Sequence, residues 1–164
     1  MSGLGRVRMA AKILKISKVN VPRVFQAQFG WRTIGERRIY FRSKWEWQYA
    51  VYLEFTKDRE IIKEWEYESQ TFWFEKIKRG VRSYKPDFKV IENDGSHYWV
   101  EVKGYMDTKS MTKIKRFKKF YPKEKLVVID QKWFISNHCL VDSVVKMNKQ
   151  VSDEHSKTEE GNGK

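Results

Sequence analysis

The sequence predicts an α/β fold in which a mixed β-sheet is flanked by helices. Segments with the helical spacing of apolar residues and short segments with the two-residue period of strands follow one another in the order helix, strands, helix, strand. The chain has 164 residues, of which 40% are hydrophobic and 15% aromatic, and this is enough for the core of one domain. We expect that domain over residues 41–148.

Residues 1–40 form the least regular part of the sequence. The first 35 residues contain seven Lys and Arg and no acidic residue. An arm that lies on nucleic acid has this composition, and so does an organellar transit peptide. Because the segment 24–41 has the pattern of a hairpin, we expect residues 1–40 to be a basic N-terminal arm or a small hairpin.

The first helix is expected from about Lys44 to Lys57. Ser43 stands before it with Glu46 three residues on, which is the Ser-x-x-Glu arrangement of a capping box. After this helix, Trp65 and Tyr67 alternate with glutamates, which is the period of a half-buried strand.

Two further strands are expected in the segments YKPDFKVI and HYWVEVKG. The turn signal Asp94-Gly95 lies between them, so the two strands form an antiparallel hairpin. Apolar residues then recur at helical spacing from Thr108 to Tyr121, and Pro122 ends this second helix. The sequence KLVVID follows as a short strand of the buried kind.

The C-terminal part divides into one or two short helices and a polar tail. The helical segment QKWFISNHCLVDSVVKMN is expected to pack on an edge of the domain. From Ser152 onward the sequence has no aliphatic or aromatic residue, so residues 149–164 are expected to be a disordered polar tail. Cys139 is the single cysteine of the chain, which excludes an intrachain disulfide.

Two carboxylates and a lysine fall on the predicted hairpin. Residues two apart in a strand point to the same face, so Glu101 and Lys103 project together while Val102 points into the core. Asp87 follows Pro86 at the start of the preceding strand, and the sequence leaves open the register that would bring it to Glu101. Neighbouring carboxylates repel each other unless a cation lies between them, and hard oxygen ligands suit Mg²⁺ or Mn²⁺. The alternative is an ordinary Glu-Lys surface pair and an unrelated aspartate.

A divalent ion beside a lysine has the parts needed to hydrolyse a phosphodiester. The ion neutralises charge that develops on the phosphate and lowers the pKa of a bound water, while the ammonium group orients that water and stabilises the transition state. The formal net charge of +13 indicates a polyanionic partner, and nucleic acid is the leading candidate.

The pair Pro86-Asp87 followed by Glu101-Val102-Lys103 resembles the bipartite motif of the PD-(D/E)xK nuclease superfamily. The blocks FRSKWE, YKPDF and VEVKG, in this order, are similar to those of the phage endonuclease I family of Holliday-junction resolvases and, more distantly, of TnsA-type transposon endonucleases. The likeness covers residues 41–130. It implies a restriction-endonuclease-like core and makes residues 41–148 a nuclease domain.

The resemblance also implies roles for individual residues. Asp87 and Glu101 would bind the metal with the main-chain carbonyl of Val102 as a further ligand, and Lys103 would be the catalytic lysine. Glu46 lies in the family's helix block and would join the site, at a second metal position. Glu46 therefore has two interpretations, as a capping-box partner and as a catalytic carboxylate.

Basic residues gather on the second predicted helix, which carries no acidic residue. Three of them share one stripe beside its apolar face, as expected of a phosphate track or of a solvated lysine face. The candidate DNA-binding residues are Arg42, Lys109, Lys113, Lys115, Arg116 and Lys119.

The expected activity is that of a Mg²⁺-dependent endodeoxyribonuclease that prefers branched DNA, as in the recombination of a phage or mobile element. The alternatives are a nicking or single-cut nuclease without junction preference and a non-catalytic nucleic-acid-binding accessory protein. Two coordinated cuts need two active sites, so we expect a homodimer, with the stretch Thr71–Phe74 in its interface or, alternatively, in the core. The sequence has no apolar run long enough for a membrane span and no signal peptide, which predicts a cytoplasmic protein.

Overall fold

The computed structural model describes residues 30–161, with side chains described through residue 150. The expected basic arm therefore lies, up to residue 29, outside the described residues. The elements in chain order are β1 (Gly30–Ile34), β2 (Arg37–Phe41), α1 (Lys44–Asp58), β3 (Glu64–Tyr67), β4 (Phe72–Trp73), β5 (Ser83–Tyr84), β6 (Phe88–Ile91), β7 (His97–Val102), α2 (Thr108–Phe120), β8 (Leu126–Ile129), α3 (Gln131–Ser136) and α4 (His138–Gly161).

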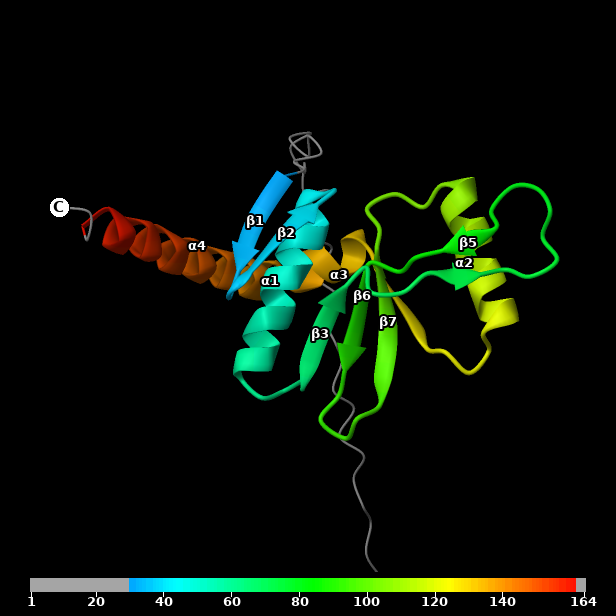
Figure 1. The fold of residues 1–164 in the computed structure, drawn as a ribbon, viewed down its shortest axis with the longest axis horizontal. Helices are drawn as coiled ribbons and strands as arrows, with labels where there is room; N and C mark the ends of the chain where they lie inside the picture. Colours follow the sequence, from blue (N-terminus) through cyan, green and yellow to red (C-terminus); the bar gives the residue numbers. More distant parts are fainter. Residues whose placement is uncertain (1–29, 162–164) are drawn as a thin grey trace, which may run out of the picture.

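The central sheet has the strand order β3-β6-β7-β8 (Figure 1). β6 pairs antiparallel with both β3 and β7, while β8 runs parallel to β7. The predicted α/β class, a mixed sheet flanked by helices, is confirmed. The predicted β6-β7 turn is also confirmed, and its Gly95 has a φ of 85°, a left-handed conformation that glycine adopts without steric cost.

The two faces of the sheet carry separate hydrophobic clusters. α1 and α4 cover one face, where Leu53 of α1 packs in the same cluster as Val100 of β7. α2 and the two-stranded β4-β5 ribbon cover the other face, where Phe72, Trp99 and Phe117 pack together. Since Trp99 and Val100 are consecutive residues that point to opposite faces, β7 is buried from both sides.

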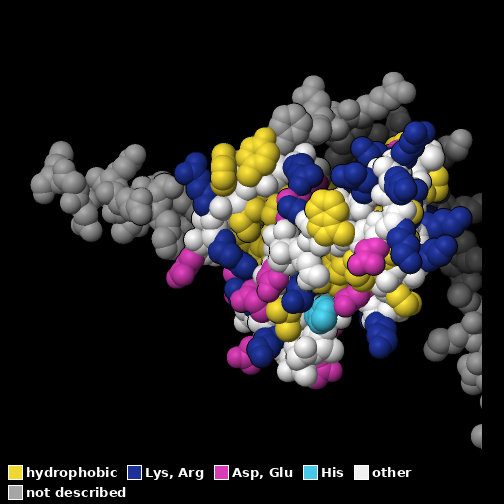
Figure 2. Space-filling model, turned by 45° about the vertical axis from the view of Figure 1, so that its right-hand side comes forward, with side chains coloured by type: hydrophobic (Ala, Val, Ile, Leu, Met, Phe, Trp, Pro, Cys, Tyr) yellow, Lys and Arg dark blue, Asp and Glu magenta, His cyan; other side chains and the backbone are white. Residues whose placement is uncertain are grey.

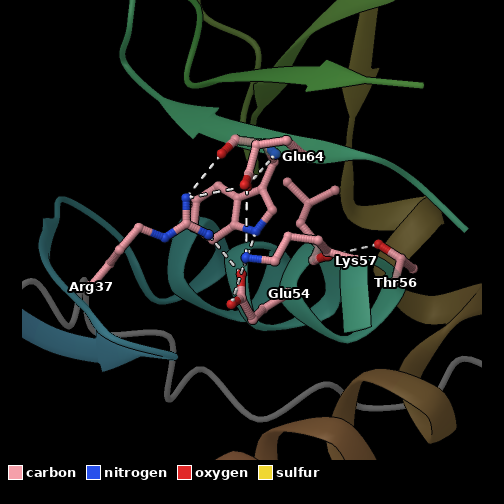
Figure 3. A network of polar contacts seen from close by, with 7 residues as sticks. Arg37, Glu54, Thr56, Lys57 and Glu64 are labelled. Atoms are coloured by element: carbon pink, nitrogen blue, oxygen red, sulfur yellow. Dashed lines mark hydrogen bonds and ion pairs between the residues drawn. The ribbon is translucent and has the colours of Figure 1, made fainter. Parts of the chain in front are cut away.

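The β1-β2 hairpin lies against α1, and a network of polar contacts ties it there (Figure 3). Arg37 of β2 donates a hydrogen bond to Glu54 of α1 at 2.6 Å, and the indole N–H of Trp65 donates to the same carboxylate at 2.7 Å. Lys57 lies 3.1 Å from the other oxygen of Glu54. A Cβ at Gly35 would lie 2.6 Å from this carboxylate and the φ is 56°, so a side chain here would displace Glu54 and strain the turn between β1 and β2.

The C-terminal segment differs from the prediction. The predicted one or two helices are present as α3 and α4, but α4 continues through Gly161, so the expected disordered tail is wrong for residues 149–161. This segment contains Glu, Lys and Gln, which have good helix propensity. It also extends an existing helix, so it does not need a nucleus of its own.

Two smaller expectations are also settled by the packing. β8 was expected to be buried, but in the described structure it pairs with β7 alone at the edge of the sheet, and only Ile129 of its residues is buried. In the aromatic stretch, Phe72 and Phe74 are each 3% exposed, as the core interpretation predicts. Trp73 between them is 60% exposed because neighbouring residues of a strand point to opposite sides.

Candidate active site

The register of the β6-β7 hairpin brings Asp87 and Glu101 together. The ladder pairs Phe88 with Val100, so the same register places Asp87, directly before β6, opposite Glu101 in β7. Residues that lie opposite each other in adjacent strands point to the same face. The main-chain N–H of Val102 donates a hydrogen bond of 2.7 Å to the Asp87 carboxylate, which holds this side chain across the strand pair.

Glu101 lies on the face of the sheet that α2 and the β4-β5 ribbon cover. Its side chain is buried, with 6% of the residue exposed. The hydroxyl of Tyr84, from β5, donates a hydrogen bond of 2.8 Å to the carboxylate. Burial, together with the negative charge of Glu101, raises the pKa of Tyr84, so this phenol stays protonated and remains a donor.

Glu46 occupies the first turn of α1, where it completes the helix cap. Its main-chain N–H donates to the Ser43 hydroxyl at 3.1 Å, and that hydroxyl donates to the Glu46 carboxylate at 2.9 Å. The other carboxylate oxygen accepts hydrogen bonds from the main-chain N–H of Arg42 at 3.1 Å and from the Tyr67 hydroxyl at 2.7 Å. The capping interpretation is confirmed, and the second interpretation, as a site carboxylate, stays a prediction.

The three carboxylates share an excess of negative charge. Burial is the main cause that raises the pKa of Asp87 from 3.8 to about 8, and the charges of Glu101 and Glu46 raise it further. Burial also raises the pKa of Glu101, against the hydrogen bond from Tyr84 and the positive charge of Lys103. Among the residues that the structure describes, no ion pair neutralises Asp87, Glu101 or Glu46.

Lys103 follows β7 directly and is half-buried. Its main-chain N–H donates to the Ile129 carbonyl at 2.8 Å, which extends the parallel pairing with β8 by one residue. The positive charge of Lys103 opposes the raised pKa of both Asp87 and Glu101, so the ammonium group lies within electrostatic reach of the pair. The predicted combination of two carboxylates and a lysine therefore meets at one place in the fold.

The predicted DNA-binding residues divide into two groups. Three of them line one hollow of the surface: Arg42, Lys109 and Lys113. The guanidinium group of Arg116 is instead hydrogen-bonded to the main-chain carbonyl of Val81, and Lys115 and Lys119 are exposed on α2 away from that hollow. The hollow is also lined by Tyr84, which links it to the carboxylates.

Sequence reasoning missed the two tyrosines that hold the carboxylates, Tyr84 for Glu101 and Tyr67 for Glu46. The sequence carries no signal for Tyr84, because β4 and β5 are two residues long and show no periodicity. Tyr67 was recognised as a residue of a strand, but its partner in α1 depends on how the helix packs on the sheet.

Two carboxylates of the site are suited to bind a divalent cation. Within the described part of the chain, no group of three or more His, Cys, Asp and Glu side chains is arranged to hold a metal ion. The fit therefore rests on Asp87 and Glu101, whose hard oxygens form no ion pair in the described chain, and on the main-chain carbonyl of Val102. Both oxygens of Glu46 are engaged in the helix cap, so its second-metal role stays a prediction.

Fold and site together define an α/β domain with a carboxylate pair and a lysine at one end of a mixed sheet. The chain belongs to the family described as "Protein of unknown function (DUF1064)", whose model matches residues 26–136. This match spans the elements from β1 to α3 and contains the carboxylate pair and Lys103. Neither the comparison with curated proteins nor the comparison with solved structures gave a match. No helix in residues 30–161 has the length and apolar character to cross a membrane.

Proposed function

We propose that this protein is a Mg²⁺- or Mn²⁺-dependent DNA endonuclease of the PD-(D/E)xK type that acts on branched DNA. One observation carries the proposal: Asp87 lies opposite Glu101 across β6 and β7, close to Lys103, and no ion pair of the described chain neutralises the two carboxylates. Glu101 is buried and Asp87 is half-buried, so holding their like charges side by side is costly for folding, and such perturbed groups are concentrated at functional sites.

Each group of the site has a task in phosphodiester hydrolysis. Asp87, Glu101 and the main-chain carbonyl of Val102 hold the divalent ion, which supplies positive charge for the phosphate and acidifies a water molecule. Lys103 orients the attacking water and stabilises negative charge on the phosphate. Tyr84 positions Glu101 through its hydrogen bond of 2.8 Å.

The DNA substrate is supported by charge and by resemblance. The chain has a formal net charge of +13, and basic residues of α2 line the hollow beside the carboxylates. The preference for branched DNA follows from the resemblance of the blocks FRSKWE, YKPDF and VEVKG to phage endonuclease I, which also supports a restriction-endonuclease-like core and a place of action in the cytoplasm of a host cell.

The test is cleavage of a synthetic four-way junction and of a linear duplex of the same sequence, with Mg²⁺ or with EDTA. We expect cleavage of the junction with Mg²⁺ and none with EDTA. The variants Asp87→Ala and Lys103→Ala should lose cleavage while junction binding stays within about threefold. Binding without metal-dependent cleavage of any DNA by the wild-type protein would replace the nuclease with the non-catalytic accessory protein.

A homodimer is part of the proposal, because two coordinated cuts across a junction require two sites. Its mass would be about 40 kDa, twice the 19.8 kDa of the chain. Light scattering coupled to size exclusion should give this mass at about 0.3 M salt, where the repulsion between basic subunits is screened. A monomer mass both with and without junction DNA would favour the single-cut alternative.

A further inference from the structure

A groove lies beside the carboxylates, between the β4-β5 ribbon with its connecting loop and α2. It consists of two hollows of about 430 and 580 Å³, which share Val81 and Lys109 in their walls. We call the two hollows together the cationic groove. Figure 2 shows Lys and Arg side chains gathered on the side of the molecule that carries the β4-β5 ribbon and α2. The basic residues that line it are Arg42, Arg82, Lys85, Lys109, Lys113 and Arg116.

The groove has a strong excess of positive charge. No acidic residue lines either hollow in the described part of the chain. Glu68, behind the groove, forms ion pairs with Arg42 and with Lys85, the latter at 3.7 Å, whereas Arg82 and Lys113 have no ion pair among the described residues. Glu101, beyond Tyr84, also feels the charge of Lys113, so two carboxylates stand against six cations and the groove keeps an excess of positive charge for a ligand.

The groove leads to the proposed active site. Tyr84 lines the first hollow, and the same side chain donates its hydroxyl hydrogen bond to Glu101. Glu68, which holds two of the groove's cations, is joined to the neighbourhood of Asp87, because its main-chain N–H donates to the Asp87 carbonyl at 2.8 Å. Glu68 has a φ of 47°, a strained conformation for a residue with a side chain, and such strain is concentrated at functional sites.

We propose that the cationic groove binds the phosphodiester backbone of one unpaired nucleic-acid strand, at phosphates adjacent to the one that enters the carboxylate site. Hollows of this size match the pockets that bind single small ligands, roughly 300–1,000 Å³, so each has room for about one nucleotide of a single strand. The inference rests on the proposed function and narrows its substrate to DNA in which a strand leaves the duplex beside the cut, as at a flap or a junction.

The test measures binding without metal, so that it does not depend on cleavage. Fluorescence anisotropy in EDTA would follow a labelled single strand of 12 nucleotides and the duplex of the same sequence. The groove variant is Arg82→Ala/Lys85→Ala, and the matched control is Lys63→Ala/Lys123→Ala, which removes the same charge at exposed positions outside the groove. All four side chains are exposed, so the fold should be unchanged, as circular dichroism would verify.

The groove variant should bind the single strand about 30-fold more weakly and the duplex no more than about threefold more weakly, and the control should change both by less than about threefold. The slope of log K against log salt for the single strand should become shallower by about 1.4, or about 0.7 for each lost phosphate contact. An equal loss of affinity for single strand and duplex, or an equal loss in the groove variant and the control, would contradict the proposal that the groove binds a single strand.

The outcomes separate this inference from the nuclease proposal. If the groove variant binds the single strand more weakly than the control but the wild-type protein cleaves no DNA, the groove proposal stands and the nuclease proposal is rejected. Metal-dependent cleavage by a protein whose groove variant binds like the control would retain the nuclease and reject the groove.

Discussion

The carboxylates of Glu54 and Asp87 lie in one small domain and have opposite electrostatic environments. Burial alone would raise the pKa of Glu54, but the hydrogen bonds from Lys57 and Trp65 and the charge of Arg37 lower it (Figure 3). At Asp87, burial and the neighbouring carboxylates raise the pKa. Arg37 and Lys57 both lie within ion-pair distance of Glu54, whereas Asp87 has no such cation in the described chain.

The difference separates a structural carboxylate from a candidate functional one. The chain has 34 Lys and Arg residues, so the absence of an ion pair at Asp87 does not come from a shortage of basic residues. The Glu54 network joins β2, α1 and β3, and its charges are balanced by partners that the fold supplies. The Asp87 and Glu101 pair gains no such balance, which is expected where the missing charge comes from a ligand.

The largest effect expected from this comparison is on cleavage. The substitution Glu101→Gln should lower the initial rate of Mg²⁺-dependent junction cleavage by about 10³-fold, because it removes a charge that the proposed metal site requires. Glu54→Gln should leave the rate within about threefold at 25 °C, because Glu54 does not contact the site. A comparable loss in both variants would contradict the distinction between the two carboxylates.

Stability should respond in the opposite way. Glu54→Gln leaves Arg37 and Lys57 with only their longer ion pairs to Glu64, at 3.5 and 3.8 Å, so the free energy of unfolding should fall by about 1–3 kcal/mol. Chemical denaturation would measure it, with Glu66→Gln in β3 as the control, since Glu66 forms no ion pair among the described residues. If Glu66→Gln costs as much as Glu54→Gln, the network has no special role.

The two carboxylates should also give opposite dependences of stability on pH. Because the pKa of Asp87 is raised to about 8 in the fold, the folded state binds more protons than the unfolded state between pH 3.8 and about 8. Stability in EDTA should therefore fall as the pH rises through this window. Glu54, with a lowered pKa, contributes stability above its ordinary pKa of 4.5 that is lost in acid.

Urea unfolding of Asp87→Asn in EDTA at pH 5 and pH 8 would test this expectation. The variant should be more stable than the wild type at pH 8 by about 1–2 kcal/mol and should lose most of that advantage at pH 5. Addition of Mg²⁺ at pH 8 should stabilise the wild type and leave the variant unchanged. A wild type whose stability in EDTA does not fall toward pH 8 would show that the pair is not strained by its charge.

The smallest effect is expected at the tyrosine that positions Glu101. Tyr84→Phe removes one hydrogen bond and keeps the buried ring, so cleavage at saturating Mg²⁺ should stay within a few-fold. The Mg²⁺ concentration for half-maximal cleavage should rise about tenfold, because partners behind a ligand orient it. Tyr67→Phe, which removes a donor from Glu46, is the comparison, and an equal shift in both variants would place Glu46 at the metal as well.

Sequence signals that act over a few residues predicted their elements well. Ser43 and Glu46 predicted the start of α1, and the contacts between their side chains and main chains are present as expected. Asp94-Gly95 predicted the β6-β7 turn, and the helix predicted from Thr108 to Tyr121 is α2, which ends one residue earlier at Phe120. Each of these features depends on hydrogen bonds between neighbours in the chain, so the local sequence contains the necessary information.

The sequence by itself determined which chemical groups are available: the motif residues Asp87, Glu101 and Lys103, the capping pair of α1 and a basic second helix. Only the tertiary structure decided which groups meet. The register of β6 against β7 sets Asp87 opposite Glu101, and the docking of the β4-β5 ribbon on α2 brings Tyr84 to Glu101 and forms the cationic groove. These contacts join residues far apart in the chain, and their energies come from burial and packing, which no short stretch of sequence contains.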